Sequence, residues 1–172
     1  MKHGIYDSYL IDDTYNNDLA GLEMALNFLN QHQTKRDKLL ILSDIHESGL
    51  SEEVLYVSVK ELLVAKGITE IIGVGEALNR QQPAAGIYFN TTEQFLEELP
   101  KEVLSSRFIL VKGARVFGFE RITRRLEQKV HGTVFEINLD SVQNNLNFYR
   151  KKLKPPTKLM AMVKAYAYGS GS

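Results

Sequence analysis

Leu10-Ile-Asp-Asp-Thr-Tyr-Asn-Asn-Asp-Leu19 is the stretch of sequence that decides the fold. A short apolar run, expected as a strand over residues 8–12, breaks into acids and amides, and Asp18 then has the position of a helix N-cap. Apolar residues follow at helical spacing, at Leu19, Leu22, Leu26 and Leu29. Ligands of open α/β sheets bind at the carboxyl ends of the strands, so polar residues placed here are candidates for a site.

The alternation of strand and helix continues to about residue 128. Further strands are expected at residues 39–42, 68–74, 86–89 and 107–112, and helices after Ser51, after Thr91 and from Phe119 to about Lys129. The run at residues 39–42 is entirely apolar, which is typical of parallel strands covered on both faces. Alternating strands and helices imply parallel pairing through right-handed crossovers. The sequence therefore predicts a Rossmann-like, doubly wound, mostly parallel α/β domain over residues 1–129.

The remaining residues, 130–172, show a second, shorter pattern. Strands are expected at residues 133–139 and 158–163. Between them Asp140 is expected to cap a helix that Pro155 and Pro156 stop, with an inward face made of Val142, Leu146, Tyr149 and Leu153. Such a β-α-β piece is too short to close a barrel or to bury a core of its own.

Composition restricts the function. The 172 residues contain 21 basic and 21 acidic side chains without a basic block, which argues against a nucleic-acid partner and a polybasic membrane contact. Cysteine is absent, which excludes disulfides and cysteine metal sites. No apolar run approaches the roughly 18 residues of a membrane span. We expect a soluble, cytoplasmic protein without membrane insertion.

Four polar clusters fall at expected strand ends. They are Asp12, Asp13, Tyr15 and Asn16; Asp44, His46 and Glu47; Lys112 and Arg115; and Lys164 with Tyr168. The first three should converge on one edge of the sheet, where carboxylates and amides facing two cations could hold the ribose and phosphates of a nucleotide. The alternative is that the acids cap helices and the cations form surface pairs worth at most about 1 kcal/mol each. Spacing alone leaves both readings open.

Three further features of the sequence give weaker indications of function. The loop of Asp44, His46 and Glu47 favours a hydrogen-bond network over a metal site, because a second set of ligands is missing. Gly73 and Gly75 lack the full dinucleotide fingerprint and favour an ordinary turn. Lys164 ends an apolar run, and a lysine in such a place can lose solvation and form a Schiff base with an aldehyde cofactor.

Residues 5–128 resemble the C-terminal domain of the Mur ligases that join D-alanyl-D-alanine to UDP-N-acetylmuramoyl tripeptide. Residues 11–17 are similar to the family's D-D-x-Y-N-x-N, Leu42-Ser-Asp-Ile-His-Glu-Ser-Gly49 to its L-G-D-M-x-E-L-G, and Lys112-Gly-Ala-Arg115 to its K-G-S-R. Ser43 replaces a glycine of that pattern and Ala114 replaces a serine.

The ligase resemblance implies ATP, Mg²⁺ and an acyl phosphate that the amine of D-alanyl-D-alanine attacks. It places Asp13 and Asn16 on the ATP side of the site, and Asp44, Lys112 and Arg115 on the substrate side. No G-x-x-x-x-G-K-[ST] occurs, so this chain alone lacks the loop that cradles the phosphates.

The tail resembles the start of alanine racemase, through Phe135-Glu-Ile-Asn-Leu-Asp-Ser-Val-Gln-Asn-Asn-Leu146 and Met162-Val-Lys-Ala-Tyr-Ala-Tyr-Gly169. Many racemases have a histidine where Ser170 stands. The resemblance implies that Lys164 holds pyridoxal phosphate and is one of two racemisation bases, that Tyr168 lies near the cofactor phosphate, and that alanine is the substrate of a homodimer.

Together the two resemblances imply a bifunctional ligase and racemase of peptidoglycan synthesis, of which residues 130–172 are the first part of a TIM-type barrel. We expect this segment alone to be inactive. The competing interpretation is a non-catalytic Rossmann-like nucleotide-binding or docking module.

Overall fold

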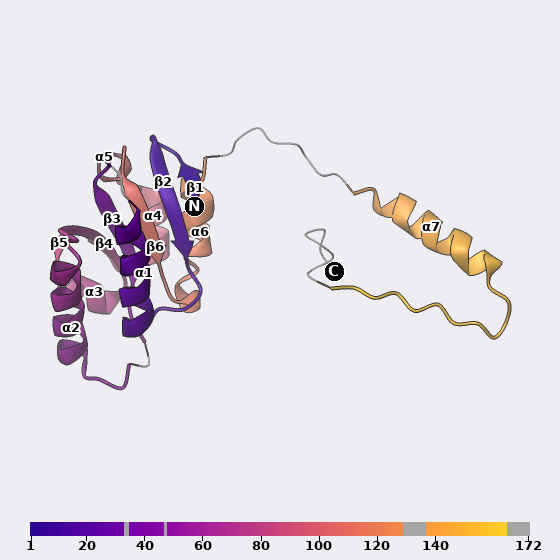
Figure 1. The fold of residues 1–172 in the computed structure, drawn as a ribbon, viewed down its shortest axis with the longest axis horizontal. Coiled ribbons are helices and arrows are strands. Elements are labelled where there is room, and N and C mark those ends of the chain that lie inside the picture. Colours follow the sequence, from indigo (N-terminus) through magenta and orange to yellow (C-terminus); the bar gives the residue numbers. More distant parts are fainter. Residues whose placement is uncertain (33–34, 47, 129–136, 165–172) are drawn as a thin grey trace. The chain divides into compact units, whose positions relative to one another are not determined.

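The computed structural model describes residues 1–32, 35–46, 48–128 and 137–164. It contains two compact units, residues 1–129 and residues 130–172, each of which is described by itself (Figure 1).

The first unit is built on one six-stranded sheet. Its strands lie in the order β1 (Lys2–Gly4), β2 (Ser8–Asp13), β6 (Phe108–Lys112), β3 (Lys38–Ser43), β4 (Glu70–Val74) and β5 (Ala85–Phe89). All neighbours pair in parallel except β1, which runs antiparallel to β2. In this register Asp13 is opposite Lys112, and Lys112 is opposite Leu42. The carboxyl ends of β2, β6 and β3 are therefore adjacent.

Helices cover both faces of the sheet (Figure 1). On one face lie α1 (Leu19–Gln31), α2 (Glu52–Ala65) and α3 (Glu76–Gln81), and on the other α4 (Thr92–Glu98), α5 (Lys101–Leu104) and α6 (Glu120–Leu126). A single 3₁₀ turn, η1 (Arg115–Phe117), precedes α6. The predicted doubly wound, mostly parallel α/β fold is confirmed.

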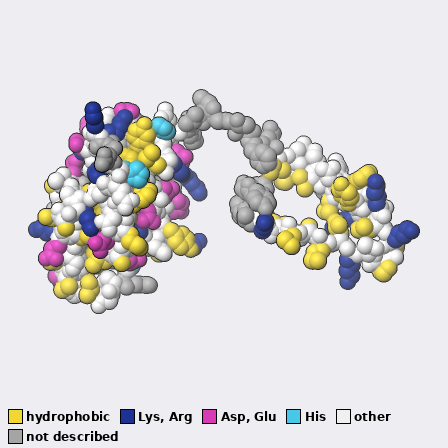
Figure 2. Space-filling model, viewed as in Figure 1, with side chains coloured by type: hydrophobic (Ala, Val, Ile, Leu, Met, Phe, Trp, Pro, Cys, Tyr) yellow, Lys and Arg dark blue, Asp and Glu magenta, His cyan; other side chains and the backbone are white. Residues whose placement is uncertain are grey.

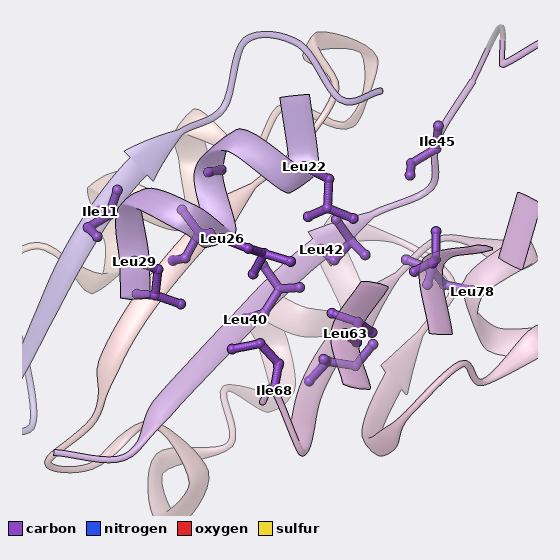
Figure 3. Packing of buried hydrophobic residues seen from close by; sticks show 14 of the residues in the cluster. Ile11, Leu22, Leu26, Leu29, Leu40, Leu42, Ile45, Leu63, Ile68 and Leu78 are labelled. Carbon is purple, nitrogen blue, oxygen red and sulfur yellow. The ribbon is translucent and has the colours of Figure 1, made fainter. Parts of the chain in front are cut away.

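The central strand β3 shows why its sequence is continuously apolar. Leu40 and Leu42 pack against α1 and α2 (Figure 3), whereas Leu39 and Ile41 lie in the opposite layer, and all four are fully buried. Successive side chains of a strand alternate between its faces, so a strand covered on both sides needs apolar residues at every position.

The predicted helix starts are observed. The Asp18 side chain accepts a hydrogen bond from the backbone N–H of Gly21 at 2.7 Å, Ser51 caps α2 through Val54, and Thr91 caps α4 through the N–H of Gln94 at 3.2 Å. These contacts satisfy N–H groups that have no partner inside the helix. Four short elements, β1, α3, α5 and η1, were not predicted, because three to six residues carry too little periodicity to be recognised.

The second unit differs from its predictions in three ways. Its helix, α7 (Leu139–Lys152), is capped by Asn138, which accepts from the N–H of Ser141 at 2.9 Å, and not by Asp140. The expected strand at residues 158–163 is wrong, since those residues form no ladder. The predicted inward face of α7 is also wrong, because no residue of α7 is buried and Tyr149 is 61% exposed. Figure 2 shows hydrophobic side chains at the surface of this unit.

One physical cause explains the missing strand and the exposed helix face. Strands need neighbouring strands, and an apolar helix face needs a surface to cover it; residues 137–164 contain neither. Most of the strand expected at residues 133–139 lies outside the described residues, and Leu139 begins α7 instead. No described helix is both long enough and apolar enough to cross a bilayer.

Candidate functional site

Lys112 is the buried centre of the carboxyl edge. It ends β6, is 2% exposed, and its Nζ lies 2.9 Å from Oδ2 of Asp13 at the end of β2. The same ammonium donates a hydrogen bond to the backbone carbonyl of Asn16. The backbone N–H of Gly113 donates to the carbonyl of Asp13 at 3.2 Å. One cation thus ties the β2–α1 loop to β6.

Asp44 has a different set of partners. Its buried carboxylate accepts hydrogen bonds from the backbone N–H groups of Ala77 and Leu78, at 3.1 and 2.8 Å, and from the hydroxyl of Tyr56 at 3.2 Å. Burial, followed by the negative charge of Asp44, raises the pKa of Tyr56 well above its usual value. Asp44 therefore holds the first turn of α3 in place, with both of its oxygens occupied.

Asn17 and Ser43 form a buried polar node behind the edge. The side-chain amide of Asn17 donates to the carbonyl and hydroxyl oxygens of Ser43, at 2.9 and 3.1 Å, and approaches the carbonyl of Asp44 at 3.2 Å. The Ser43 hydroxyl accepts from the N–H of Ala114 at 2.8 Å and donates to the carbonyl of Asp44. The Oδ1 atom of Asn17 is buried and has no hydrogen-bond partner among the described residues.

A pocket of about 690 Å³ opens at this edge, and we name it the edge pocket. One wall is residues 15–18 and the other is residues 114–116, with His46 between them. The guanidinium carbon of Arg115 lies 5.8 Å from the ring centroid of Tyr15, a cation–π distance. The His46 ring stacks on Phe117 at 5.4 Å.

A second pocket, of about 490 Å³, lies on the other side of His46, which is the residue that lines both. It contains Tyr56, Glu52 and Arg80. Arg80 forms an ion pair with Glu52 at 2.8 Å, and hydrogen bonds from Arg80 and then Gln81 lower the pKa of Glu52. The charged residues of its lining are three acids, Asp44, Glu52 and Glu76, and one cation, Arg80, so the lining has more acidic than basic side chains.

The predicted cofactor lysine is in the second unit. Lys164 lies in an exposed segment without regular structure, and Tyr168 is outside the described residues, as is Glu47 of the β3–α2 loop. Among the described residues there is no group of three or more His, Asp or Glu side chains arranged to hold a metal.

The two units resemble different known proteins. A curated relative, the UDP-N-acetylmuramoyl-tripeptide–D-alanyl-D-alanine ligase of Escherichia coli strain K12, is 28% identical over 123 residues, which are 69% of this chain and 27% of the relative. An alignment of that length is far longer than the tail and lies mostly on the first unit. The family model for the N-terminal domain of alanine racemase matches residues 137–172.

The chain joins a segment similar to a Mur ligase to a segment similar to the start of an alanine racemase domain.

Solved structures agree with the fold of the Mur ligase-like segment. MurF of Acinetobacter baumannii matches with a TM-score of 0.56 and 24% identity, over 69% of this chain and 28% of that protein. MurF ligase of Thermotoga maritima, solved in complex with ADP, matches with a TM-score of 0.55 and 17% identity, again over 69% and 28%. The chain thus spans little more than a quarter of the proteins that it resembles.

The structure brings most of the predicted site residues to one edge. Asp13, Asn16 and Lys112 are in direct contact, and Arg115 lies across the edge pocket from Asn16. Asp44 directly follows the adjacent strand β3 but faces α3. The substrate and nucleotide roles of these residues stay predictions. The Asn17–Ser43 node was not foreseen, because an amide and a hydroxyl after strands resemble ordinary loop residues until their burial is known.

Proposed function

We propose that this chain is the junction of a bifunctional enzyme of peptidoglycan precursor synthesis. Its first unit is the C-terminal domain of a ligase that uses ATP to join D-alanyl-D-alanine to UDP-N-acetylmuramoyl tripeptide. Its second unit, residues 130–172, is the beginning of a pyridoxal phosphate-dependent alanine racemase barrel. The observation that carries the proposal is the covalent continuity of a ligase-like segment and a racemase-like segment in one chain.

In the ligase reaction, the tripeptide carboxylate takes the terminal phosphoryl group of ATP and ADP leaves. The amine of D-alanyl-D-alanine then attacks the acyl carbon, an amide bond forms and phosphate leaves. We assign Asp13 and Asn16 to the nucleotide side of this site and Arg115 to a phosphate or carboxylate, since Arg115 is exposed at the edge pocket. Guanidinium groups bind such planar or tetrahedral anions through paired hydrogen bonds.

Lys112 and Asp44 have narrower assignments. Lys112 is buried and committed to Asp13 and Asn16, so its proposed contribution is a positive potential behind the edge pocket and a fixed loop rather than direct contact with a substrate. Asp44, with both oxygens occupied, is proposed to act on the substrate side by holding α3.

Binding of ATP and Mg²⁺ would need residues outside this chain. The edge pocket offers carboxylate and amide groups, but the described residues contain no metal cluster and the sequence has no phosphate-cradling loop. We therefore place the loop and the metal in the part of the ligase that this chain does not span.

Pyridoxal phosphate fits the chemistry of Lys164, because a primary amine can carry an aldehyde cofactor that stabilises negative charge at the substrate Cα. In the complete racemase, Lys164 would hold the cofactor and move a proton at the alanine Cα, and Tyr168 would bind near its phosphate. The opposing base and the rest of the barrel would come from residues beyond this segment and from a second subunit of a homodimer. We place the enzyme in the cytoplasm.

The test is to express the complete protein that contains this segment and to measure both reactions. ATP-dependent ligation of D-alanyl-D-alanine, alanine racemisation, and a loss of racemisation in Lys164→Ala with ligation intact would support the proposal. Lys158→Ala is the matched control, since it removes another exposed lysine of the same segment. Absence of both activities would favour the non-catalytic binding module instead.

The isolated chain gives an independent test. Most of the racemase barrel and the phosphate-cradling loop are missing from it, and correct positioning of several groups is a large part of catalysis. We expect neither ligation nor racemisation from the purified 172-residue chain. Racemisation of alanine by this chain in the presence of pyridoxal phosphate would contradict the assignment of an incomplete site.

A further inference from the structure

Both walls of the edge pocket are attached to one hydroxyl group. The Ser43 hydroxyl accepts a hydrogen bond from the Ala114 N–H, which starts the wall of residues 114–116, and another from the side chain of Asn17 in the wall of residues 15–18. Ser43 itself is fully buried and does not line the pocket. It lies at the end of β3, the strand next to β6.

We propose that Ser43 and Asn17 are positioning residues that set the spacing of the two pocket walls. Neither wall belongs to a strand, so the sheet ladder does not fix the distance between them. The Ser43–Asn17 contact joins the β2–α1 loop, the end of β3 and the β6–η1 loop at one point, and it sets this distance together with the hydrogen bond from Lys112 to Asn16. This inference rests on the proposed function only for the identity of the ligand.

The hydrogen bonding of Asn17 supports a positioning role. Its two amide hydrogens face three acceptors, while its Oδ1 receives no hydrogen bond from the described residues and the residue is only 6% exposed. Leaving a buried acceptor without a partner is unfavourable, so simple stabilisation is a poor explanation for an amide here. The amide is instead placed where its donors can reach the Ser43 backbone and hydroxyl together.

The geometry also excludes a reversed Asn17 amide. If Oδ1 and Nδ2 exchanged places, the oxygen would face the carbonyls of Ser43 and Asp44 at about the present distances, and three acceptors would repel one another. The hydrogen-bond network therefore determines which atom faces Ser43.

The first experiment measures the pocket walls in the 172-residue chain by amide hydrogen exchange and NMR. In Ser43→Ala the Ala114 amide loses its acceptor, and we expect its exchange to accelerate about fivefold or more, with shifted signals of Tyr15 and Arg115. Ser8→Ala is the matched control: Ser8 is equally buried and donates to the Ile5 carbonyl at 2.7 Å, at the amino end of β2. If Ser43→Ala leaves these signals as Ser8→Ala does, the proposal is wrong.

The second experiment measures function in the complete enzyme. We expect Ser43→Ala and Asn17→Ala each to raise the KM for ATP about fivefold or more, with kcat changed less, and Ser8→Ala to change neither. Equal kinetic effects of Ser43→Ala and Ser8→Ala would overturn the proposal. Asn17→Ala keeps the test decisive if Ser43→Ala folds poorly, because it also removes the unpartnered Oδ1.

The two experiments separate the two claims. A wild-type enzyme without ligase activity would contradict the proposed function, and the NMR measurement would still decide whether Ser43 and Asn17 hold the walls. A wild-type enzyme with ligase activity, together with unchanged wall signals in both variants, would contradict the positioning role alone.

Discussion

Nζ of Lys112 and Oδ2 of Asp13 lie 2.9 Å apart, yet their surroundings are unequal, because the Lys112 side chain is 3% exposed and that of Asp13 is 39% exposed. Removing Lys112 and removing Asp13 therefore leave the remaining charge in different surroundings. Without Lys112, the Asp13 carboxylate can be hydrated. Without Asp13, a buried ammonium keeps only the carbonyl of Asn16 among the contacts described above.

We expect Asp13→Ala to destabilise the chain more than Lys112→Met. An uncompensated buried charge costs several kcal/mol, and partial access of water reduces our expectation for Asp13→Ala to about 2 kcal/mol. Lys112→Met keeps an apolar stem and should cost about 1 kcal/mol or less. Urea unfolding of the two variants and of the double variant checks the order. The reverse order would show that Lys112 is not held mainly by Asp13.

Gly75 and Asp44 are a second coupled pair. Gly75 has a φ of +143°, and a β-carbon added to it would lie 2.2 Å from Cγ of Asp44. We expect Gly75→Ala to reduce the free energy of unfolding by about 3 kcal/mol, from backbone strain and from the displaced carboxylate. Gly49→Ala is the control, since Gly49 also has a positive φ but open space around it, and it should cost about 1 kcal/mol.

A double variant distinguishes strain from collision at Gly75. In an Asp44→Ala background the collision is absent, so Gly75→Ala should cost less than it does in the wild type. Additive effects in urea unfolding would mean that the two residues do not compete for the same space.

Tyr56 gives a prediction for pH. Burial and then the Asp44 carboxylate raise its pKa above the ordinary 10.0, so the folded chain holds this proton more tightly than the unfolded chain. The stabilisation is complete below pH 10 and decreases as the pH rises above 10. Tyr56→Phe should cost about 1 kcal/mol near pH 8, from the lost hydrogen bond to Asp44. Because phenylalanine has no proton to lose, this difference should narrow above pH 10.

Urea unfolding of both proteins across the alkaline range measures that difference. Tyr149→Phe, at an exposed position of α7, is the control and should show the same pH dependence as the wild type. A difference between wild type and Tyr56→Phe that stays constant, or widens, above pH 10 would contradict the prediction.

The amide hydrogens of α7 should exchange much faster than those of α1. The two helices have similar lengths, 14 and 13 residues, but α1 buries Leu22, Leu26 and Leu29 whereas α7 buries no residue. An isolated helix of this length is marginal in water. Hydrogen exchange followed by mass spectrometry checks the contrast in the 172-residue chain. In a longer protein that includes the remaining racemase sequence, the same α7 amides should become protected; continued fast exchange there would contradict the barrel assignment.

The sequence was informative wherever the local pattern and the tertiary structure agree. The apolar run of β3 and the caps at Asp18, Ser51 and Thr91 are local signals that the folded unit uses unchanged. The strand and inward-face predictions for the second unit were wrong, because its alternating and amphipathic patterns describe surfaces that residues 137–164 cannot cover by themselves.

The position of the site could be predicted from the sequence, but the interaction partners of its residues could not. The order of strands put Asp13 and Lys112 at one edge, as parallel pairing requires. Whether Lys112 would face solvent or Asp13, and whether Asp44 would face a ligand or α3, depends on packing between residues far apart in sequence. The burial of Ser43, on which the buried polar node with Asn17 depends, is likewise a property of the whole fold.

The antiparallel strand β1 has a consequence for where the chain leaves the first unit. Gln128 donates to the carbonyl of His3 and Ile5 donates to the carbonyl of Leu126, so the first unit ends beside its own beginning, along the β1 side of the sheet. No residue of β1 lines the edge pocket. Chain can therefore be added after residue 128 without changing any residue that lines the edge pocket.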